Sequence, residues 1–403
     1  MVIAGAGPAG LATALFLVKR RPELAGRIVA IEKSAHPRFK VCAGGLIPKT
    51  MLALDELGIP LDVPAVEVIR GEAATPVGSV DLSRSGDVLA TVIRRDRFDA
   101  MLARAAVGAG VEIVQRSRVL DVTQDADGVR VSTDGGIFDA QILVGADGSG
   151  SRVRRSAFGA RKEAIGRALM TDIAVDPERT PEFTSKRYRF DFRCVSRGIS
   201  GYSWSFPCLI GGAPHLNVGI YDQRAHEFAE NGGEQSQMIA ELVAAFPELP
   251  LDGLKSRATR WHSFPIRWFN AADSYASGRV ILAGDAAGVD PLMGEGISCA
   301  FEHGKLAAGS ICKFLGGDAD ALRAYDHALH HDAVGRKMSK LAFAARNFYG
   351  PRHRLFFRIA GVSRRAQELG VDWYNGARHL DELPTHRLIA RWARAVLLGE
   401  PVR

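Results

Sequence analysis

Three glycines within the first ten residues constrain the fold of this chain more than any other feature. Gly5, Gly7 and Gly10 follow the apolar run 2–4 and precede residues 11–19, whose alanines and leucines are typical of a helix. In a strand–turn–helix unit, the first glycine permits the tight turn and the second lets the backbone approach a pyrophosphate. The third lets helix and strand pack closely. The sequence therefore predicts a βαβ unit that binds a dinucleotide.

The predicted second strand of this unit, residues 27–32, ends in an acid. Glu32 stands 22 residues after Gly10, and a carboxylate at such a position accepts hydrogen bonds from ribose hydroxyl groups. The helix after the glycines presents backbone N–H groups and the positive end of its dipole to phosphates. These features together indicate dinucleotide binding, and they do not distinguish FAD from NAD.

Two further turns that contain Gly and Asp follow predicted strands later in the chain. The first is the run 145–152, with Asp147 and Gly148, and the second is the run 284–288, with Asp285. An Asp there can accept a hydrogen bond from a ribitol or ribose hydroxyl, and the glycines leave backbone N–H groups open to a phosphate. Either turn alone is equally typical of a surface loop, because Asp-Gly is common in turns.

The order of the three turns resembles the flavoprotein hydroxylase superfamily, in which a GxGxxG turn is followed by a DG motif and then by a GD motif. The resemblance covers about residues 1–315 and implies one bound FAD. It also implies that FAD is contacted from near a helix that begins around Arg95 and from the run PLMGEG at 291–296. The residues expected to bind FAD are Gly5, Gly7, Ala9, Gly10, Glu32, Lys33, Cys42, Ala43, Gly44, Arg95, Asp147, Gly148, Gly284, Asp285, Ala286, Pro291, Gly294, Glu295, Gly296 and Ile297.

Two more motifs resemble those of the geranylgeranyl reductases within that superfamily. The run KVCAGG at 40–45 is similar to their Lys-x-Cys-Gly-Gly segment, with Ala43 where that family has Gly. The run YSWSFP at 202–207 is similar to their Tyr-x-Trp-x-Phe-Pro signature. The resemblance implies an FAD-dependent oxidoreductase that reduces C=C bonds of a polyprenyl (geranylgeranyl-type) group on a lipid, quinone or diphosphate. Reduced FAD would deliver a hydride from its N5, and a nearby acid would supply a proton.

The aromatic motif has a direct physical interpretation. Alternate side chains of a strand share one face, so Tyr202, Trp204 and Phe206 can form a wall that holds a long apolar chain. We expect these three and Pro207 to contact the substrate, and Tyr202 and Trp204 to be catalytic. The alternative is a sheet face packed on a domain core. Cys42 is a candidate proton donor or redox partner, although a single Cys is more often a small buried hydrophobic residue.

The pattern of elements predicts an α/β (α+β two-domain) fold. A Rossmann-like FAD-binding domain carries an inserted, largely antiparallel β-rich substrate domain and is followed by a helical C-terminal region. Strands are predicted at 66–71 and 77–92, antiparallel strands between 187 and 221, and a long helix at 294–314. The predicted parts are 1–60, 94–160 and 275–330 for the FAD-binding domain, 61–93 and 161–274 for the substrate domain, and 331–403 for the basic helical region.

Composition excludes several classes of protein. The 403 residues, 47% of them hydrophobic, are typical of a folded globular chain of two or three domains. No window approaches 18 uninterrupted apolar residues, and the N-terminus has no signal-peptide pattern, so we expect no membrane-spanning helix. Five scattered cysteines argue against a disulfide framework or a metal site. We therefore expect a reducing, cytoplasmic location.

The net charge of +7 is distributed unevenly. From residue 336 to the end, 14 Lys and Arg oppose 5 Asp and Glu, a balance of +9, whereas the rest of the chain carries −2. A basic tail can contact an anionic lipid, a nucleic acid or an acidic partner, or it can be a solvated helical surface. We expect peripheral contact with an anionic membrane and no nucleic-acid partner. The aromatic residues that favour this choice are Phe348, Tyr349, Phe356, Phe357, Trp373 and Trp392.

Other functions remain open on the same fold. One is a flavin-dependent monooxygenase (hydroxylase or epoxidase) or halogenase, and another is a non-catalytic flavin-binding electron carrier. Halogenases carry Trp-x-Trp-x-Ile-Pro, so Tyr202 and Phe206 argue against halogenation. No second GxGxxG turn indicates a separate nicotinamide domain, so we expect transient NADPH or a reduced ferredoxin as the electron donor. The sequence leaves the head group of the substrate and the oligomeric state open.

Overall fold

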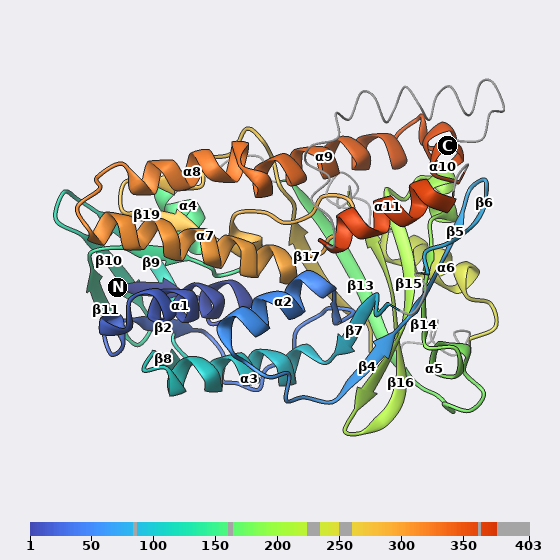
Figure 1. The fold of residues 1–403 in the computed structure, drawn as a ribbon, viewed down its shortest axis with the longest axis horizontal. Helices are drawn as coiled ribbons and strands as arrows, with labels where there is room; N and C mark the ends of the chain where they lie inside the picture. Colours follow the sequence, from blue (N-terminus) through green and yellow to red (C-terminus); the bar gives the residue numbers. More distant parts are fainter. Residues whose placement is uncertain (84–86, 160–163, 224–233, 250–259, 362–363, 377–403) are drawn as a thin grey trace.

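A computed structural model describes residues 1–83, 87–159, 164–223, 234–249, 260–361 and 364–376 of the chain. It confirms the α/β fold class, with one mainly parallel sheet, one large mixed sheet and two smaller sheets. The mainly parallel sheet lies at one end of the molecule and the large mixed sheet at the other (Figure 1). Helices α8 (Ala321–His331) and α9 (Ala333–Phe348) follow one another along one side from the first end to the second (Figure 1).

The mainly parallel sheet has six strands in the order β18-β19-β12-β1-β2-β8. Every neighbouring pair is parallel except β18 with β19. The three residues of β1 are fully buried, as expected where other elements cover both faces of a parallel sheet. The strands are β1 (Val2–Ala4), β2 (Val29–Glu32), β8 (Glu112–Gln115), β12 (Leu143–Gly145), β18 (Ala276–Ser277) and β19 (Val280–Leu282).

Helix α1 (Pro8–Arg20) packs closely against helix α7 (Ile297–Leu315). The approach is tight at Gly304, where an added Cβ would lie 2.8 Å from the backbone nitrogen of Thr13 and 2.9 Å from the Cβ of Ala12. Helix α3 (Arg95–Gly108) also contacts α1. The predicted helix at 294–314 begins only at Ile297, because Gly294 has a left-handed φ of 65° that an α-helix cannot include.

The large mixed sheet has seven strands in the order β17-β13-β16-β15-β14-β5-β6. The predicted antiparallel strands between 187 and 221 are confirmed as β14, β15 and β16. The pairing of β14 with β5 is parallel, and the sequence did not predict it. The strands are β5 (Arg70–Thr75), β6 (Gly78–Asp81), β13 (Ile165–Ala174), β14 (Arg187–Asp191), β15 (Gly201–Ile210), β16 (Ala213–Asp222) and β17 (His262–Arg267).

Two strands predicted as continuous were wrong, because each is divided between two sheets. The segment 66–71 contains the end of β4 (Ala65–Val68) and the start of β5, and the segment 77–92 contains β6 and part of β7 (Ala90–Ile93). Strands β4 and β7 pair with β3 (Gly45–Leu46) in a small separate sheet. Hydrophobic alternation shows which residues are buried, and it does not show which sheet a strand joins.

The remaining elements complete the two ends and the connecting side. Helices follow one another to residue 375, as the helical composition of the C-terminal region predicts, and Trp392 lies outside the described residues. Among the described residues no helix has the length and apolar character needed to cross a membrane. These elements are α2 (Pro48–Leu57), β9 (Val119–Gln124), β10 (Val129–Thr133), β11 (Gly136–Ala140), α4 (Arg152–Phe158), α5 (Pro181–Thr184), α6 (Glu234–Ala245), α8 (Ala321–His331), α9 (Ala333–Phe348), α10 (His353–Gly361) and α11 (Arg364–Asn375), with 3-10 turns η1 (Pro22–Leu24), η2 (Arg193–Arg197) and η5 (Gly284–Ala286).

Two glycines of α7 provide a matched test of the packing between α1 and α7. Gly304→Ala pushes a methyl group against the backbone of α1 and is expected to lower the free energy of unfolding by about 1–3 kcal/mol. At Gly309 an added Cβ meets only the flexible end of Arg20, so Gly309→Ala is expected to gain roughly 1 kcal/mol of helix propensity. Thermal unfolding midpoints should therefore shift in opposite directions, and equal shifts would contradict the close crossing of the two helices.

Candidate functional site

The three glycine-rich turns meet at one edge of the six-stranded sheet. They follow β1, β12 and β19, which are adjacent parallel strands, so their carboxyl ends lie together. Backbone hydrogen bonds continue from the strands into the turns, since Ala146 N donates to Ala4 O at 2.7 Å and Ala283 N donates to Gly145 O at 2.9 Å. The DG and GD motifs are therefore part of one site and not isolated surface loops.

The turns approach so closely that side chains are excluded at two glycines. Gly5 has a φ of 104°, and a Cβ there would lie 2.3 Å from the backbone oxygen of Ala146. Gly284 has a φ of 62°, and a Cβ there would lie 2.6 Å from the Cβ of Ala9. Ser149 Oγ also donates to Asp285 Oδ2 at 3.1 Å, which joins the second turn to the third. Glycine is required at both positions for the turns to converge.

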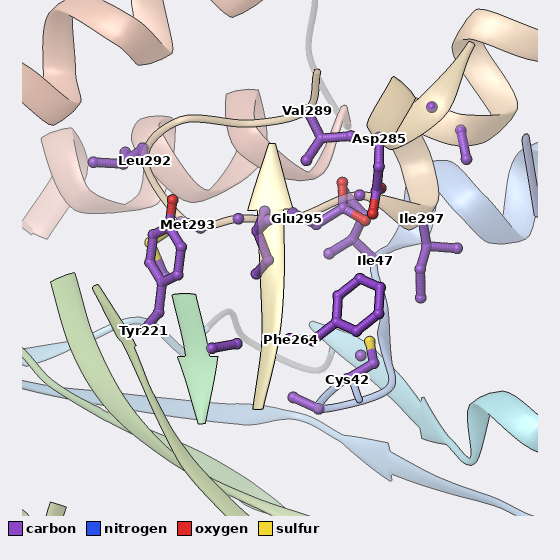
Figure 2. Close-up of a pocket in the computed structure, with 18 of the residues that line it drawn as sticks. Cys42, Ile47, Tyr221, Phe264, Asp285, Val289, Leu292, Met293, Glu295 and Ile297 are labelled. Atoms are coloured by element: carbon purple, nitrogen blue, oxygen red, sulfur yellow. The ribbon is translucent and has the colours of Figure 1, made fainter. Parts of the chain in front are cut away.

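A cavity of about 890 Å³ begins at this edge and extends past the seven-stranded sheet to helices α9, α10 and α11. Figure 2 shows its middle part, with Cys42 and Phe264 on one side and Asp285 and Glu295 on the other. Most of the residues predicted to bind FAD line it: Gly5, Gly7, Ala9, Glu32, Lys33, Cys42, Ala43, Gly44, Arg95, Asp147, Gly148, Gly284, Asp285, Gly294, Glu295, Gly296 and Ile297.

Four predicted residues lie outside the described cavity wall. Gly10 packs against the backbone, since a Cβ there would lie 2.0 Å from Gly5 O. Ala286 is fully buried within η5, and the carbonyl of Pro291 accepts a hydrogen bond from Gln223 at 2.6 Å. Pro207 is adjacent to Phe206 in β15 and so points to the opposite face of the strand. These residues shape the walls from behind and do not face the cavity.

Buried charges surround the first turn. The carboxylate of Glu32 accepts hydrogen bonds from Ala6 N at 3.2 Å and Ser34 N at 3.1 Å. Arg38, to which the sequence assigned no role, lies 3.5 Å from Glu32 and 3.4 Å from Asp99. Arg95, at the start of α3, binds Asp99 through two hydrogen bonds of 2.8 and 3.0 Å. Asp99 therefore holds both guanidinium groups beside the cavity.

The geometry around Arg38 fits the diphosphate of a dinucleotide. Its terminal nitrogen Nη2 lies 3.2 Å from the position of an added Cβ at Gly7, so the guanidinium faces the bare backbone of the first turn. Its Nε atom is buried, lies 3.5 Å from Glu32 Oε2 and makes no hydrogen bond to any described residue. A guanidinium group beside a side-chain-free turn at a helix start is suited to a phosphate. Arg38 and the first turn would therefore hold the diphosphate of FAD.

The second and third turns are supported by side chains behind them. Asp147 accepts hydrogen bonds from Ser151 Oγ at 2.5 Å and from Arg152 N at 2.6 Å, and so caps α4. Burial raises the pKa of Asp147, and these hydrogen bonds oppose the increase. Gly284 N donates to Nδ1 of His303 at 3.1 Å. Because burial lowers the pKa of His303 to about 4, its ring is neutral and can accept this hydrogen bond.

The loop that carries Cys42 forms another wall of the cavity. A Cβ at Gly44 would lie 1.9 Å from Ile93 O, so the loop rests directly on β7. Gly44 N donates to Cys42 Sγ at 3.3 Å, and Arg95 lies beside the same thiol. In Figure 2 the sulfur of Cys42 points toward Phe264. Cys42 and Ala43 both line the cavity.

Lys40 is a second ionisable group on this loop. Its Nζ lies 4.0 Å from Asp285 Oδ2 and 3.1 Å from the centre of the Phe264 ring. The pKa of Lys40 is lowered to about 8, mainly by burial and also by the charges of Arg95 and Arg38, while Asp285 opposes the decrease. The sequence motif contains this lysine, but only the fold shows that its ammonium group lies beside Asp285 in the cavity.

Hydroxyl groups of three tyrosines hold the loop 290–296. Tyr202 donates to Met293 O at 2.5 Å, Tyr349 donates to Leu292 O at 2.5 Å, and Tyr374 donates to Asp290 Oδ2 at 2.7 Å. Burial raises the pKa of Asp290 to about 6, and the hydrogen bond from Tyr374 opposes this increase. Residues from β15, from the end of α9 and from α11 thus position the loop that carries Gly294 and Glu295.

The predicted catalytic aromatic residues have structural partners. The hydroxyl of Tyr202 is bound to Met293 O, and Nε1 of Trp204 donates to Asn217 Oδ1 at 2.8 Å. Burial raises the pKa of Tyr202 far above its ordinary value. Glu295 is also engaged, because it accepts a hydrogen bond from Ser298 N at 2.8 Å near the start of α7. In this arrangement Tyr202 and Trp204 form part of the cavity wall, and their polar hydrogens are engaged in hydrogen bonds; their catalytic role stays a prediction.

The part of the cavity beside the seven-stranded sheet is an aromatic chamber. Tyr202, Trp204 and Phe206 share one face of β15 and line the cavity, as the period of the strand predicts. Residues of the neighbouring strands add to this wall, and the alternation from 188 to 192 in the sequence was the signal for them. The lining residues from 73 to 90 and from β13 to β17 carry no charge: Ala73, Thr75, Val80, Leu82, Leu89, Ala90, Ala168, Tyr188, Phe190, Phe192, Tyr202, Trp204, Phe206, Tyr221, Phe264 and Ile266.

Comparison of sequences shows what the chain is similar to. The family described as "FAD binding domain" matches residues 1–338. A menaquinone reductase of Mycolicibacterium smegmatis is 27% identical over 360 residues, which cover 85% of this chain and 84% of that protein. A 3-hydroxybenzoate 6-hydroxylase of Klebsiella oxytoca is 24% identical over 402 residues, with coverage of 93% and 96%. A digeranylgeranylglycerophospholipid reductase of Methanothrix thermoacetophila is 27% identical over 371 residues, with coverage of 84% and 85%.

A solved structure supports the fold. The crystal structure of a geranylgeranyl bacteriochlorophyll reductase-like protein from Thermoplasma acidophilum superimposes with a TM-score of 0.74 and 22% sequence identity. It covers 96% of this chain and 98% of that one. At this identity the likeness establishes the architecture alone. Together with the sequence relatives, it confirms the resemblance to geranylgeranyl reductases within the larger flavoprotein superfamily.

Arg38 provides a test of the cofactor end of the cavity. Arg38→Met removes the guanidinium that faces the first turn and is expected to weaken FAD binding about tenfold to a hundredfold, as for the loss of a charge-assisted hydrogen bond. Arg97→Met is the matched control, because Arg97 is 63% exposed on α3 and lies outside the cavity wall. Titration of each cofactor-free variant with FAD measures its dissociation constant for FAD. Equal affinities for the two variants would contradict the placement of the diphosphate beside Arg38.

Proposed function

The chain belongs to the FAD-binding domain family, and we propose that it is a reductase of carbon–carbon double bonds in a long apolar, polyprenyl-type chain. The family match makes it an FAD-dependent oxidoreductase. The relatives named as a menaquinone reductase and a digeranylgeranylglycerophospholipid reductase support reduction as the direction of the reaction. The cavity supports the apolar chain as the substrate.

The uncharged aromatic chamber is the observation that carries this proposal. It continues from the cofactor end of the cavity, and its walls from the seven-stranded sheet offer apolar and aromatic surface with no charged side chain. A hydrocarbon chain is stabilised in such a chamber by burial of apolar surface. A charged or strongly polar substrate would lose its hydration there without compensating hydrogen bonds. A polar head group is better placed at the far end, where Lys340 lines the cavity.

When bound and reduced, FAD supplies two electrons as a hydride to an alkene. Residues of this chain position the substrate and exclude water. The aromatic wall of β15 is fixed by the hydrogen bonds of Tyr202 to Met293 and of Trp204 to Asn217, so its shape is set before the substrate enters. The ordered wall places the chain against the loop 290–296, at the border between the chamber and the cofactor end.

A proton must also reach the second carbon of the reduced double bond. Among the described lining residues near the Cys42 loop, Glu295 and Tyr202 are held by other hydrogen bonds. Lys40 Nζ and Cys42 Sγ are the proton-bearing groups on the loop itself. Lys40 is suited to acid–base chemistry near neutral pH, because its pKa is lowered to about 8. Its ammonium group then supplies the proton, and the resulting amine recovers a proton from solvent.

A flavin-dependent monooxygenase is the second candidate function. It is favoured by the relative named 3-hydroxybenzoate 6-hydroxylase, whose similarity extends over 93% of this chain. Among the described lining residues, those on the chamber side of the wall carry no charge. This lack of charge favours a hydrocarbon over a hydroxybenzoate as the substrate. A non-catalytic electron carrier would have no use for such a chamber. NADPH or a reduced ferredoxin is proposed as the electron donor for the reductase.

Anaerobic turnover tests the proposed reaction. Protein reduced with dithionite should be reoxidised by geranylgeranyl diphosphate, with a product that is heavier by two hydrogen atoms for each reduced double bond. The visible spectrum follows the oxidation of the flavin, and mass spectrometry follows the reduction of the prenyl compound. The fully saturated phytanyl diphosphate is the control and should leave the flavin reduced. A product that contains isotope-labelled oxygen and forms only in air would contradict the reductase and establish the monooxygenase.

The pH dependence of this single turnover tests the proton donor. Only the ammonium form of Lys40 can donate, so the rate is expected to fall as the pH rises through about 8. Lys40→Met should be slower by about a hundredfold and should lose this dependence. Besides burial, the neighbours that shift this pKa are Asp285 on η5, Arg95 on α3, and Arg38 and Cys42 on the same loop.

Two controls separate the roles of the residues on this loop. Oxidation of the reduced flavin by ferricyanide needs no proton delivered to carbon and should be unchanged in Lys40→Met. Cys42→Ala should retain the decrease in rate near pH 8 if Lys40 is the donor. If Cys42→Ala loses the decrease in rate near pH 8 and Lys40→Met keeps that decrease, the proton donor is Cys42 and not Lys40.

A further inference from the structure

The cavity reaches the protein surface where α9 meets α10. Phe343 of α9 lines the cavity and is 41% exposed, which is unusual for so large an apolar side chain. Leu355 of α10 lies outside the wall and is 47% exposed. Both helices lie at the end of the molecule that holds the seven-stranded sheet (Figure 1). We define the entry face as Phe343, Arg346, Arg354, Leu355 and Arg358.

An uninterrupted path of aromatic rings leads from the entry face into the aromatic chamber. Successive ring centres lie 5.0 to 6.3 Å apart, within contact distance of one another. Every ring of the path lines the cavity. The order of the path, from the surface inward, is Phe343, Phe356, Phe348, Phe357, Phe192, Tyr202 and Trp204.

The charged side chains of α9, α10 and the segment that joins them are all basic. Neither α9 nor α10 contains an Asp or a Glu, and the segment 349–352 between them contains none either. Arg346, Arg354 and Arg358 of the entry face are exposed, and so are Arg336 and Arg352 nearby. Exposed apolar side chains among arginines, on amphipathic helices, match the surface of a bilayer that contains anionic lipids.

The geometry points to the entry face as a docking surface for an anionic lipid bilayer, from which an apolar chain enters the aromatic path directly. This inference rests on the proposed function for the identity of the chain that enters, whereas the docking itself does not depend on the reaction. Phe343 and Leu355 insert between the lipids, and the arginines bind the anionic head groups. Of the aromatic residues by which the sequence predicted membrane contact, Tyr349 and Phe357 are buried and Phe348, Phe356 and Trp373 line the cavity, so the exposed contacts are Phe343 and Leu355.

Co-sedimentation with vesicles tests the docking surface. The full chain with FAD bound should sediment with vesicles of equal parts phosphatidylcholine and phosphatidylglycerol, more weakly with phosphatidylcholine alone, and more weakly at high salt. The double variant Arg354→Ser, Leu355→Ser should bind the mixed vesicles at least tenfold more weakly, since each basic residue near such a surface contributes about fivefold. The control is Arg104→Ser, Ile137→Ser, because Arg104 on α3 and Ile137 on β11 are exposed and lie outside the entry face.

The reaction provides the second readout. Reduction of a short prenyl substrate in solution should be unchanged in the Arg354→Ser, Leu355→Ser variant, because neither residue lines the cavity, while reduction of a vesicle-embedded prenyl lipid should fall. Equal vesicle binding by this variant and the wild type overturns the docking surface, and so does binding that is equal with and without phosphatidylglycerol. If the wild type forms a dimer and does not bind vesicles, and the double variant is a monomer, the entry face is an interface with a second copy of the chain. That result also overturns the docking surface. Failure to reduce any prenyl compound, with vesicle binding intact, refutes the proposed function and leaves the docking surface standing.

Discussion

The close approach of backbone to backbone among three turns is the constraint on which the rest of the structure depends. Gly5 lies against Ala146 and Gly284 lies against Ala9, with no room for a Cβ at either glycine. Adjacent parallel strands bring the turns to one edge of the sheet, and the absence of side chains lets them close around a single dinucleotide. The cofactor end of the cavity exists because segments far apart in the chain meet here.

The loop 290–296 links this cofactor end to the rest of the molecule. It leads from the third turn to α7, and the hydroxyl groups of Tyr202 in β15, Tyr349 directly after α9 and Tyr374 in α11 bind it. Two of these residues, Tyr202 and Tyr374, also line the cavity. The position of the loop is therefore coupled to the aromatic wall and to the C-terminal helices. This coupling joins the cofactor end of the cavity to the chamber in which we propose that a long apolar chain binds.

Contiguous motifs predicted the cofactor end from the sequence, because each glycine-rich turn depends on local backbone geometry. The role of Arg38 was not predictable in this way, since its importance arises from Gly7 and Asp99, which reach it only through the fold. Pro207 was assigned to the substrate wall although strand alternation places it on the face opposite Phe206. The domain boundaries drawn from the sequence stay a prediction. The division of residues 66–71 between two sheets was not visible in the sequence, because the hydrophobic pattern is the same for either partner.

The binding stoichiometry of the flavin tests the central claim, that three distant turns hold one FAD. Cofactor-free protein, shown to be folded by circular dichroism, is titrated with FAD while the fluorescence of the flavin is recorded. The convergence of the turns predicts saturation at one FAD per chain and a yellow protein that retains the cofactor through gel filtration. A folded protein that takes up no FAD, or that binds it without saturation, would contradict the account.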